Sequence, residues 1–303
     1  MTTQQKSDEW KEKQKKMLAW NRLWLNYEYG QSVWTFVNGL RIPHKAINMG
    51  QGFPDESIDC PIFLKKAAQH AVFNQFNQYT ATTGQGNLVN ELIRIYNNKF
   101  NGQISLASNN EPGKIRDKIQ LTPENIQITN GCCGGCNAIF EALLNPGDEV
   151  ITLEPYFDFY KFQIAQAQGV HKTVPLRLSA NQQRWTFDPM SLKKVLNSKT
   201  KMLLLNTPHN PTGYVMSWKE MQQIASILKD FPDVIIACDE VYEYLVYDNN
   251  KHYHFAAVNS DVYARTLTLS SAAKTFSATG WKIGVCIQKQ VRQTHDVPVF
   301  VLI

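Results

Sequence analysis

Short, almost continuously apolar runs alternate with helical segments from residue 121 onward, and this alternation restricts the fold more than any other feature. The apolar runs lie at residues 126–129, 149–153, 202–205, 234–237 and 266–269. Helical spacing of apolar residues falls between them, at 135–144, 157–168 and 217–230. Strands that are apolar on both sides need cover on both faces. The sequence therefore predicts an α/β fold with a mostly parallel sheet and helices on both faces.

The region before this alternation reads as helical. Residues 60–77 and 87–100 have helical spacing, and the Asn/Ser/Gly-rich residues 101–117 indicate a loop. The first twenty residues resemble an amphipathic helix that packs on the body of the protein. No apolar run reaches the roughly 18 residues of a membrane span. The early acids Asp8, Glu9 and Glu12 are unusual for a transit peptide. We expect no membrane association and a cytoplasmic location, with mitochondria as the alternative.

Charge and cysteine content exclude several other classes. A net charge of +5 over 303 residues gives no dense basic stripe, so we expect no nucleic-acid partner. The six cysteines are scattered except for three within five residues, which is a poor disulfide framework. Cys133 and Cys136 have CxxC spacing, but no second pair completes a zinc site. We expect a reduced, intracellular chain without a metal, in which these cysteines belong to a tight turn.

Chemically distinctive residues follow four of the predicted strands. Ligands of open parallel sheets bind at the carboxyl ends of the strands. A small-residue turn at 130–136 opens a helix, which is a favourable place for phosphate. Asn206 and Asn210 lie in a proline-rich loop at 206–213, from which both amides could point into a cleft. Asp239 ends a buried strand, and Lys274 lies among small and apolar residues.

Each feature alone has an ordinary interpretation: a packed turn, a proline turn, a helix N-cap and a surface lysine. Together they are the parts that hold pyridoxal phosphate (PLP). Desolvation and the nearby Lys282 would lower the pKa of Lys274, which favours the neutral amine that binds an aldehyde. Asp239 would keep a pyridine nitrogen protonated, so that the ring can accept electrons. No GxGxxG fingerprint supports a dinucleotide enzyme instead.

The same motifs resemble class I aminotransferases of PLP fold type I. The resemblance rests on Asn206–Gly213, Asp239–Tyr242 and Ser271–Lys282. Gly50–Asp55, Asn77–Thr80 and Glu154–Asp158 are similar to the kynurenine–oxoglutarate transaminase and cysteine-S-conjugate β-lyase subgroup. The resemblance extends from about Trp34 to Gly284. It implies an N-terminal helical extension at 1–33, a large PLP-binding domain at 34–284 and a divergent tail at 285–303.

The resemblance also implies a role for each matching residue. Lys274 would bind the cofactor covalently and move the proton, and Asp239 would pair with the pyridine nitrogen. Tyr242 and Asn210 would hydrogen-bond the phenolic oxygen, and Phe157 would stack on the ring. The phosphate would be held by backbone N–H groups of Cys132 and Cys133, by Ser271 and Lys282, and by Tyr79 from a neighbouring subunit of a homodimer. Trp34, Gly52 and Asn210 would line the substrate site.

The chain departs from the family in two places. Gly131–Gly134 contains Cys132 and Cys133, where the family usually has glycine or alanine followed by a larger residue. After Gly284 the family continues for roughly a hundred residues that form a small domain and carry an arginine for the substrate carboxylate. Nothing in Val285–Ile303 matches this domain. We therefore expect a C-terminally truncated member whose activity is impaired.

The sequence is compatible with three functions. The first is PLP-dependent transamination of kynurenine, a glutamine-like or another large neutral or aromatic amino acid with a 2-oxo acid, together with elimination from cysteine S-conjugates. The second is a catalytically inactive chain that binds PLP weakly or pairs with a full-length subunit. The third is a ring-forming synthase of the same fold, which would share Lys274 and Asp239. The motifs at Gly50–Asp55 and Ser271–Lys282 favour transamination over the synthase.

Overall fold

The computed structural model describes residues 58–74, 76–104, 118–181 and 184–289, and those from Asp59 onward belong to one compact unit. The expected N-terminal helix and the boundary at residues 33 and 34 lie outside these ranges. The helices are α3 (Ile62–Phe73), α4 (Gly86–Ile104), α5 (Gly131–Leu143), α6 (Phe159–Gln166), α7 (Pro189–Val195), α8 (Trp218–Leu228), α9 (Ser260–Ala264) and α10 (Ala272–Thr275). The strands are β1 (Ile126–Asn130), β2 (Glu149–Glu154), β3 (Val170–Pro175), β4 (Arg177–Leu178), β5 (Trp185–Thr186), β6 (Thr200–Asn206), β7 (Ile235–Asp239), β8 (Thr266–Ser271) and β9 (Ile283–Gln288).

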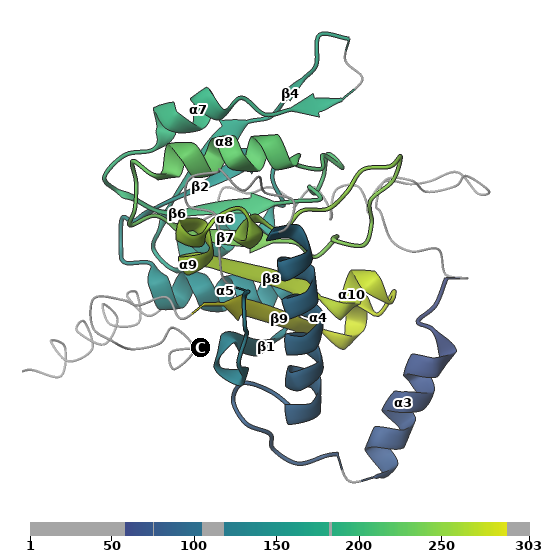
Figure 1. Ribbon diagram of the computed structural model, residues 1–303. Coiled ribbons are helices and arrows are strands. Elements are labelled where there is room, and N and C mark those ends of the chain that lie inside the picture. Colours follow the sequence, from purple (N-terminus) through teal and green to yellow (C-terminus); the bar gives the residue numbers. More distant parts are fainter. Residues whose placement is uncertain (1–57, 75, 105–117, 182–183, 290–303) are drawn as a thin grey trace, which may run out of the picture. The chain divides into compact units, whose positions relative to one another are not determined.

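Seven of these strands form one sheet, in the order β1-β9-β8-β7-β6-β2-β3 (Figure 1). The pairs β8–β7, β7–β6, β6–β2 and β2–β3 are parallel. Strand β9 lies antiparallel between β1 and β8. Strands β4 and β5 form a separate antiparallel pair. The prediction of a mostly parallel sheet is confirmed.

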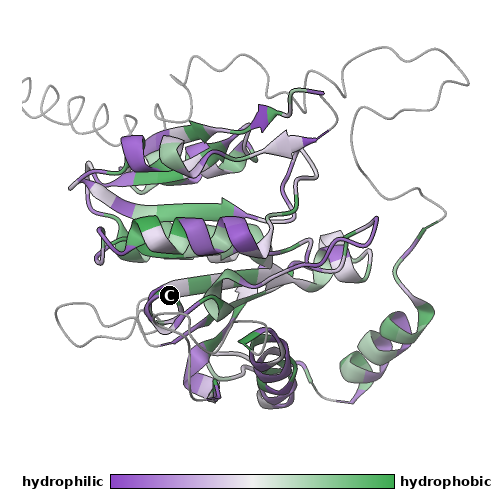
Figure 2. Cartoon of the chain, turned by 45° about the horizontal axis from the view of Figure 1, so that its top comes forward, coloured by the Kyte–Doolittle hydropathy of each residue, from purple (hydrophilic) through white to green (hydrophobic). Residues whose placement is uncertain are grey.

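The two faces of the sheet bury different sets of helices because successive residues of a strand point to opposite sides. On β6, Leu203 and Leu205 pack in a core with residues of α7 and α8. Met202 and Leu204 pack instead with residues of α5 and α6. In Figure 2, hydrophobic residues are concentrated in the strands of the sheet, and the helices carry many hydrophilic residues. Helix α4 covers alternate residues of β1 and β9 at one edge.

Within the described residues, the five predicted strands and the five helices predicted after residue 57 are present, with shifted ends. Helix α5 begins at Gly131 rather than at residue 135, so Cys132 and Cys133 lie in its first turn. Residues 101–104, expected in a loop, continue α4. Strands β3 and β9 were not predicted, and β9 extends beyond Gly284, where the family resemblance ends. Among the described residues, no helix is long and apolar enough to cross a membrane.

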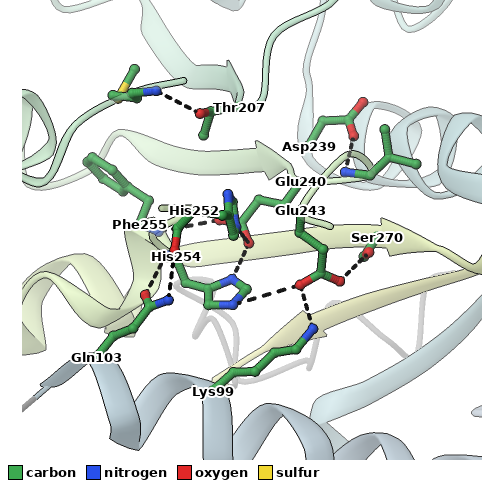
Figure 3. Close-up of polar contacts among 12 residues, drawn as sticks. Lys99, Gln103, Thr207, Asp239, Glu240, Glu243, His252, His254, Phe255 and Ser270 are labelled. Atoms are coloured by element: carbon green, nitrogen blue, oxygen red, sulfur yellow. Dashed lines mark hydrogen bonds and ion pairs between the residues drawn. The ribbon is translucent and has the colours of Figure 1, made fainter. Parts of the chain in front are cut away.

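A buried network of charged groups joins α4 to the segment after β7 (Figure 3). Glu243 accepts hydrogen bonds from Tyr96 at 2.8 Å and Ser270 at 2.9 Å, and its other oxygen lies 2.5 Å from Lys99 Nζ. His254 lies between the two carboxylates: Nδ1 contacts Glu240, and Nε2 is 3.8 Å from Glu243. These contacts fix the chain directly after Asp239.

Glu240 makes the stability of this region depend on pH. Burial alone would raise the pKa of the Glu240 carboxyl, but His254 and His252 outweigh burial and lower the pKa from 4.5 to about 2. The ionised carboxylate therefore stabilises the fold above pH 4.5, and this contribution is lost as the pH falls towards 2. A pKa difference of this size corresponds to a free energy on the order of 3 kcal/mol.

We therefore expect the free energy of unfolding, measured with urea from pH 6 to pH 2.5, to fall more steeply in the wild type than in Glu240→Gln. The amide has the size of the carboxylate but does not titrate. Equal slopes for the two proteins would show that Glu240 is not the titrating group.

Candidate active site

Asp239 is buried at the carboxyl end of β7 and accepts three hydrogen bonds. Tyr160 OH donates to Oδ2 at 2.6 Å, and the Cys132 thiol and the Val241 backbone N–H both donate to Oδ1 at 3.2 Å. Burial raises the pKa of the Asp239 carboxyl, and these three donors oppose the rise. No ion pair to Asp239 occurs among the described residues. The site thus contains a buried carboxylate held by neutral donors, which suits a cationic ring nitrogen as partner.

The sequence did not reveal two of these donors. Tyr160 lies on α6, one turn after Phe157, and no motif distinguishes it from a core aromatic residue. For Cys132 the expected contribution was its backbone N–H, whereas the structure places its thiol on Asp239. The signal available in the sequence was the position itself, a cysteine close to the carboxyl end of a strand, β1, at the start of the helix that follows it.

Lys274 lies close to Tyr242, and the hydroxyl group of Tyr242 contacts Asn210. Its Nζ is 5.7 Å from the centre of the Tyr242 ring. Asn210 Nδ2 donates to Tyr242 OH at 3.5 Å, a long hydrogen bond. Burial raises the pKa of Tyr242 to about 12, and Asp239 contributes to the rise. The phenol is therefore protonated at neutral pH and can donate to an anionic oxygen.

The Lys274 amine has the electrostatic surroundings that the sequence predicted. Burial lowers its pKa, the neighbouring Cys133 opposes this, and the charge of Lys282 lowers it further. A larger fraction of Lys274 is therefore neutral than for an exposed lysine, and only the neutral amine attacks a carbonyl carbon. Its place at the start of a short helix after β8 directs the amine to the same edge of the sheet as Asp239.

Asn206 differs from the prediction that both asparagines point into a cleft. Its side chain is buried and holds backbone: Nδ2 donates to the Asp239 carbonyl at 2.9 Å, and Oδ1 accepts from the Asn210 N–H at 2.7 Å. These two bonds tie the proline-rich loop to the end of β7. Asn206 therefore positions Asn210, and only Asn210 has its amide directed at Tyr242.

A contact between two glycines brings Lys282 to the N-terminus of α5. Gly131 has φ +68°, a conformation that favours glycine. A Cβ on Gly284 would lie 2.4 Å from the Gly131 carbonyl carbon, so the two backbones touch. A Cβ on Gly131 would lie 3.6 Å from Lys282 Cδ. The helix N-terminus, with its free N–H groups, and a lysine thus face the same place, as anion binding requires.

Ser271 and Phe157, which were also predicted to contact PLP, make contacts with other residues of the fold. The Ser271 hydroxyl donates to the Ile283 carbonyl at 2.8 Å and accepts from the Ala273 N–H at 3.1 Å. Its one proton is used within the fold, so a hydrogen bond to phosphate would require it to rotate. The Phe157 ring is half-buried and packs edge-on against Tyr160, with centroids 5.4 Å apart.

The remaining predicted residues are not brought to this group by the described structure. Tyr79 is fully exposed. Trp34 and Gly52 lie outside the described residues. The structure thus gathers Lys274, Asp239, Tyr242, Asn210, Cys132, Cys133 and Lys282 at one edge of the sheet.

Comparison with known proteins identifies the family. Residues 44–295 match the family described as aminotransferase class I and II. The chain belongs to the class I and II aminotransferases. Its relatives include a kynurenine–oxoglutarate transaminase of Dictyostelium discoideum, 35% identical over 272 residues, which covers 86% of this chain and 58% of that protein. Human kynurenine–oxoglutarate transaminase 1 is 37% identical over 281 residues, covering 88% of this chain and 62% of that protein.

Solved structures of aminotransferases have the same fold as this one. Bna3p of Saccharomyces cerevisiae superposes with a TM-score of 0.77 at 31% identity, covering 92% of this chain and 63% of that chain. The chain spans 53% to 62% of the length of the curated relatives it matches. Fold type I, expected from the sequence motifs, is confirmed.

Proposed function

We propose that this chain is a PLP-dependent aminotransferase that transfers the amino group of kynurenine, or of another large neutral or aromatic amino acid, to a 2-oxo acid. The observation that carries the proposal is the convergence of Lys274, Asp239, Tyr242 and Asn210 at the carboxyl ends of β6, β7 and β8. The names of the relatives support the amino-acid class. Elimination from cysteine S-conjugates would use the same residues.

The described residues fit PLP at each of its functional groups. The buried Asp239 carboxylate would hold the ring nitrogen in its protonated form. Tyr242 and Asn210 would hydrogen-bond the phenolic oxygen, and Phe157 would cover one face of the ring. The N-terminus of α5, with Cys132 and Cys133, and Lys282 would hold the phosphate. When bound, PLP supplies an aldehyde that takes up the amino group and a ring that delocalises the electrons of the substrate's Cα–H bond.

Lys274 would perform the acid–base work. Its lowered pKa increases the fraction of neutral amine, which could accept the substrate's Cα proton, and the resulting ammonium could return that proton to another atom. The exposed Tyr79 would reach the phosphate of a second copy in a homodimer. Trp34 and Gly52 would contact the substrate.

Half-reactions test the proposal without assuming a preferred substrate pair. We expect added kynurenine to convert the long-wavelength absorption of the PLP-loaded chain to a shorter-wavelength form, and added 2-oxoglutarate to reverse the change. Phenylalanine and glutamine are run in parallel, and D-kynurenine is the control. A PLP-loaded chain whose spectrum responds to none of the L-amino acids would contradict the proposed activity.

A further inference from the structure

Three buried ligand atoms converge beside the candidate cofactor site. They are the sulfur atoms of Cys132 and Cys136 and a carboxylate oxygen of Asp239, all within 4.8 Å of one another. Cys132 Sγ lies 3.2 Å from Asp239 Oδ1. Tetrahedral zinc, with bonds of about 2.3 Å to sulfur and 2.0–2.2 Å to oxygen, requires neighbouring ligand atoms roughly 3.5 Å apart. The spacing therefore suits a tetrahedral cation after small side-chain adjustments.

Helical geometry, rather than the CxxC spacing, selects this pair of cysteines. Cys132 and Cys136 are four residues apart on α5, so they lie on the same face of the helix. Both are buried, and they pack in the same core as Ile235 and Ala237 of β7. Cys133, which completes the CxxC motif with Cys136, is exposed and lies outside the cluster. The CxxC spacing of Cys133 and Cys136 therefore does not correspond to the pair of sulfur atoms that lies beside Asp239.

The charges at the site favour a cation. In the described part of the chain, Asp239 accepts hydrogen bonds only from neutral groups and takes part in no ion pair. A second cluster, Glu240, His252 and His254, has comparable spacing, but its carboxylate already contacts both histidines. Among the described residues, Asp239 is therefore a buried carboxylate without a positively charged partner, unlike Glu243 and Glu240. Two adjacent sulfur ligands select zinc or another thiophilic metal over magnesium or calcium.

We propose that the chain without PLP binds one thiophilic divalent cation, zinc or cadmium, through Cys132, Cys136 and Asp239. Two metal–sulfur bonds form as both thiols release their protons to solvent, and no electron is transferred. Tyr160 keeps its hydrogen bond to the other Asp239 oxygen. The metal site stands independently of the proposed function. Competition between the metal and PLP rests on that function, because the metal ion and the protonated ring nitrogen of PLP would both bind the Asp239 carboxylate.

A cadmium titration tests the site. The reduced 303-residue chain, freed of PLP, is titrated with cadmium chloride while the ultraviolet thiolate-to-cadmium absorption and the released protons are measured. We expect tight binding of cadmium to saturate at one ion per chain. Loss of an outer-sphere partner of a metal ligand typically weakens binding by roughly 10- to 100-fold. Cys132→Ser and Cys136→Ser each remove a direct ligand, so we expect each to weaken cadmium binding by at least this factor. Cys133→Ser is the matched control and should bind like the wild type.

The cysteine variants test the metal site, and the effect of PLP on cadmium binding tests whether the two ligands share Asp239. Wild-type affinity in Cys132→Ser, with circular dichroism showing a folded protein, overturns the site, and so does loss of binding in Cys133→Ser. Saturating PLP should weaken cadmium binding at least tenfold. Tight cadmium binding that PLP does not affect leaves the metal site in place and removes Asp239 from the cofactor. A PLP absorption band without any tight cadmium binding overturns the metal site alone.

Discussion

Replacing Lys274 with alanine is expected to abolish the long-wavelength absorption band that forms when PLP is added to the wild-type chain. The amine at the start of α10 is the group that faces Tyr242 and whose pKa burial lowers. Alanine removes both the nucleophile that attaches the cofactor and the base that moves the substrate proton. General acid–base catalysis alone contributes roughly 10²- to 10⁴-fold, so we expect turnover to fall by at least about 10³-fold.

Lys229→Ala is the matched control, because Lys229 is an exposed lysine at the end of α8, on a helix outside the candidate site. It should keep the band and the wild-type turnover. Added ethylamine or another small primary amine should restore part of the activity of Lys274→Ala, since it can fill the space left by the side chain. A band of wild-type intensity in folded Lys274→Ala would assign cofactor attachment to another lysine.

Removing the Lys99 ammonium is expected to cost the fold about 3 kcal/mol. Its Nζ lies 2.5 Å from Glu243 Oε2, and the Glu243 side chain is only 4% exposed. Breaking a buried pair typically costs about 3–5 kcal/mol, because the remaining charge stays buried. We expect the lower end of this range, because the Lys99 side chain is 20% exposed and Tyr96, Ser270 and His254 remain on Glu243. At roughly 2–4 °C per kcal/mol, Lys99→Met should lower Tm by about 6–12 °C.

The double variant Lys99→Met/Glu243→Gln separates the charge effect from lost packing. Neutralising the partner should recover part of the stability that Lys99→Met loses, as measured by urea unfolding at neutral pH. Arg94→Met is the control, because Arg94 and Glu91 form an exposed pair on the same helix, and such pairs contribute about 0–1 kcal/mol. If Arg94→Met and Lys99→Met destabilised the chain equally, burial of Glu243 would not be the source of the effect.

The sequence predicted those parts of the fold whose residues are buried on both sides. Strands β6 and β7 are almost wholly buried, and their unbroken apolar runs distinguish them from helices. Strand β3 was missed because it lies at the edge of the sheet and its first four residues are polar or partly exposed. The start of α5 was missed because Gly131–Gly134 has poor intrinsic helix propensity, which packing against β9 overrides.

The candidate site was predicted to the extent that its residues lie in fixed motifs. Asp239 ends β7, and Tyr242 and Lys274 lie three residues after the ends of β7 and β8, so the parallel sheet brings them to the same edge. Tyr160 and the Cys132 thiol reach Asp239 from neighbouring helices, and these contacts depend on how α5 and α6 pack on the sheet. Periodicity places a residue on a helix face, but it does not specify which atom a side chain on that face contacts.

The position of β9 has a consequence for how the chain acquires its structure during synthesis. Strand β9 lies between β1 and β8, and Ile126 pairs with Ile287, 161 positions further along the chain. On the ribosome, β1 and α5 emerge long before their partner, so the turn at Gly131 lacks the Gly284 backbone against which it packs. Pairing over such a long loop is entropically costly and slow. The parallel strands β2, β3, β6, β7 and β8 can assemble first, and we expect the N-terminal turn of α5 to become ordered only after β9 has paired with β1.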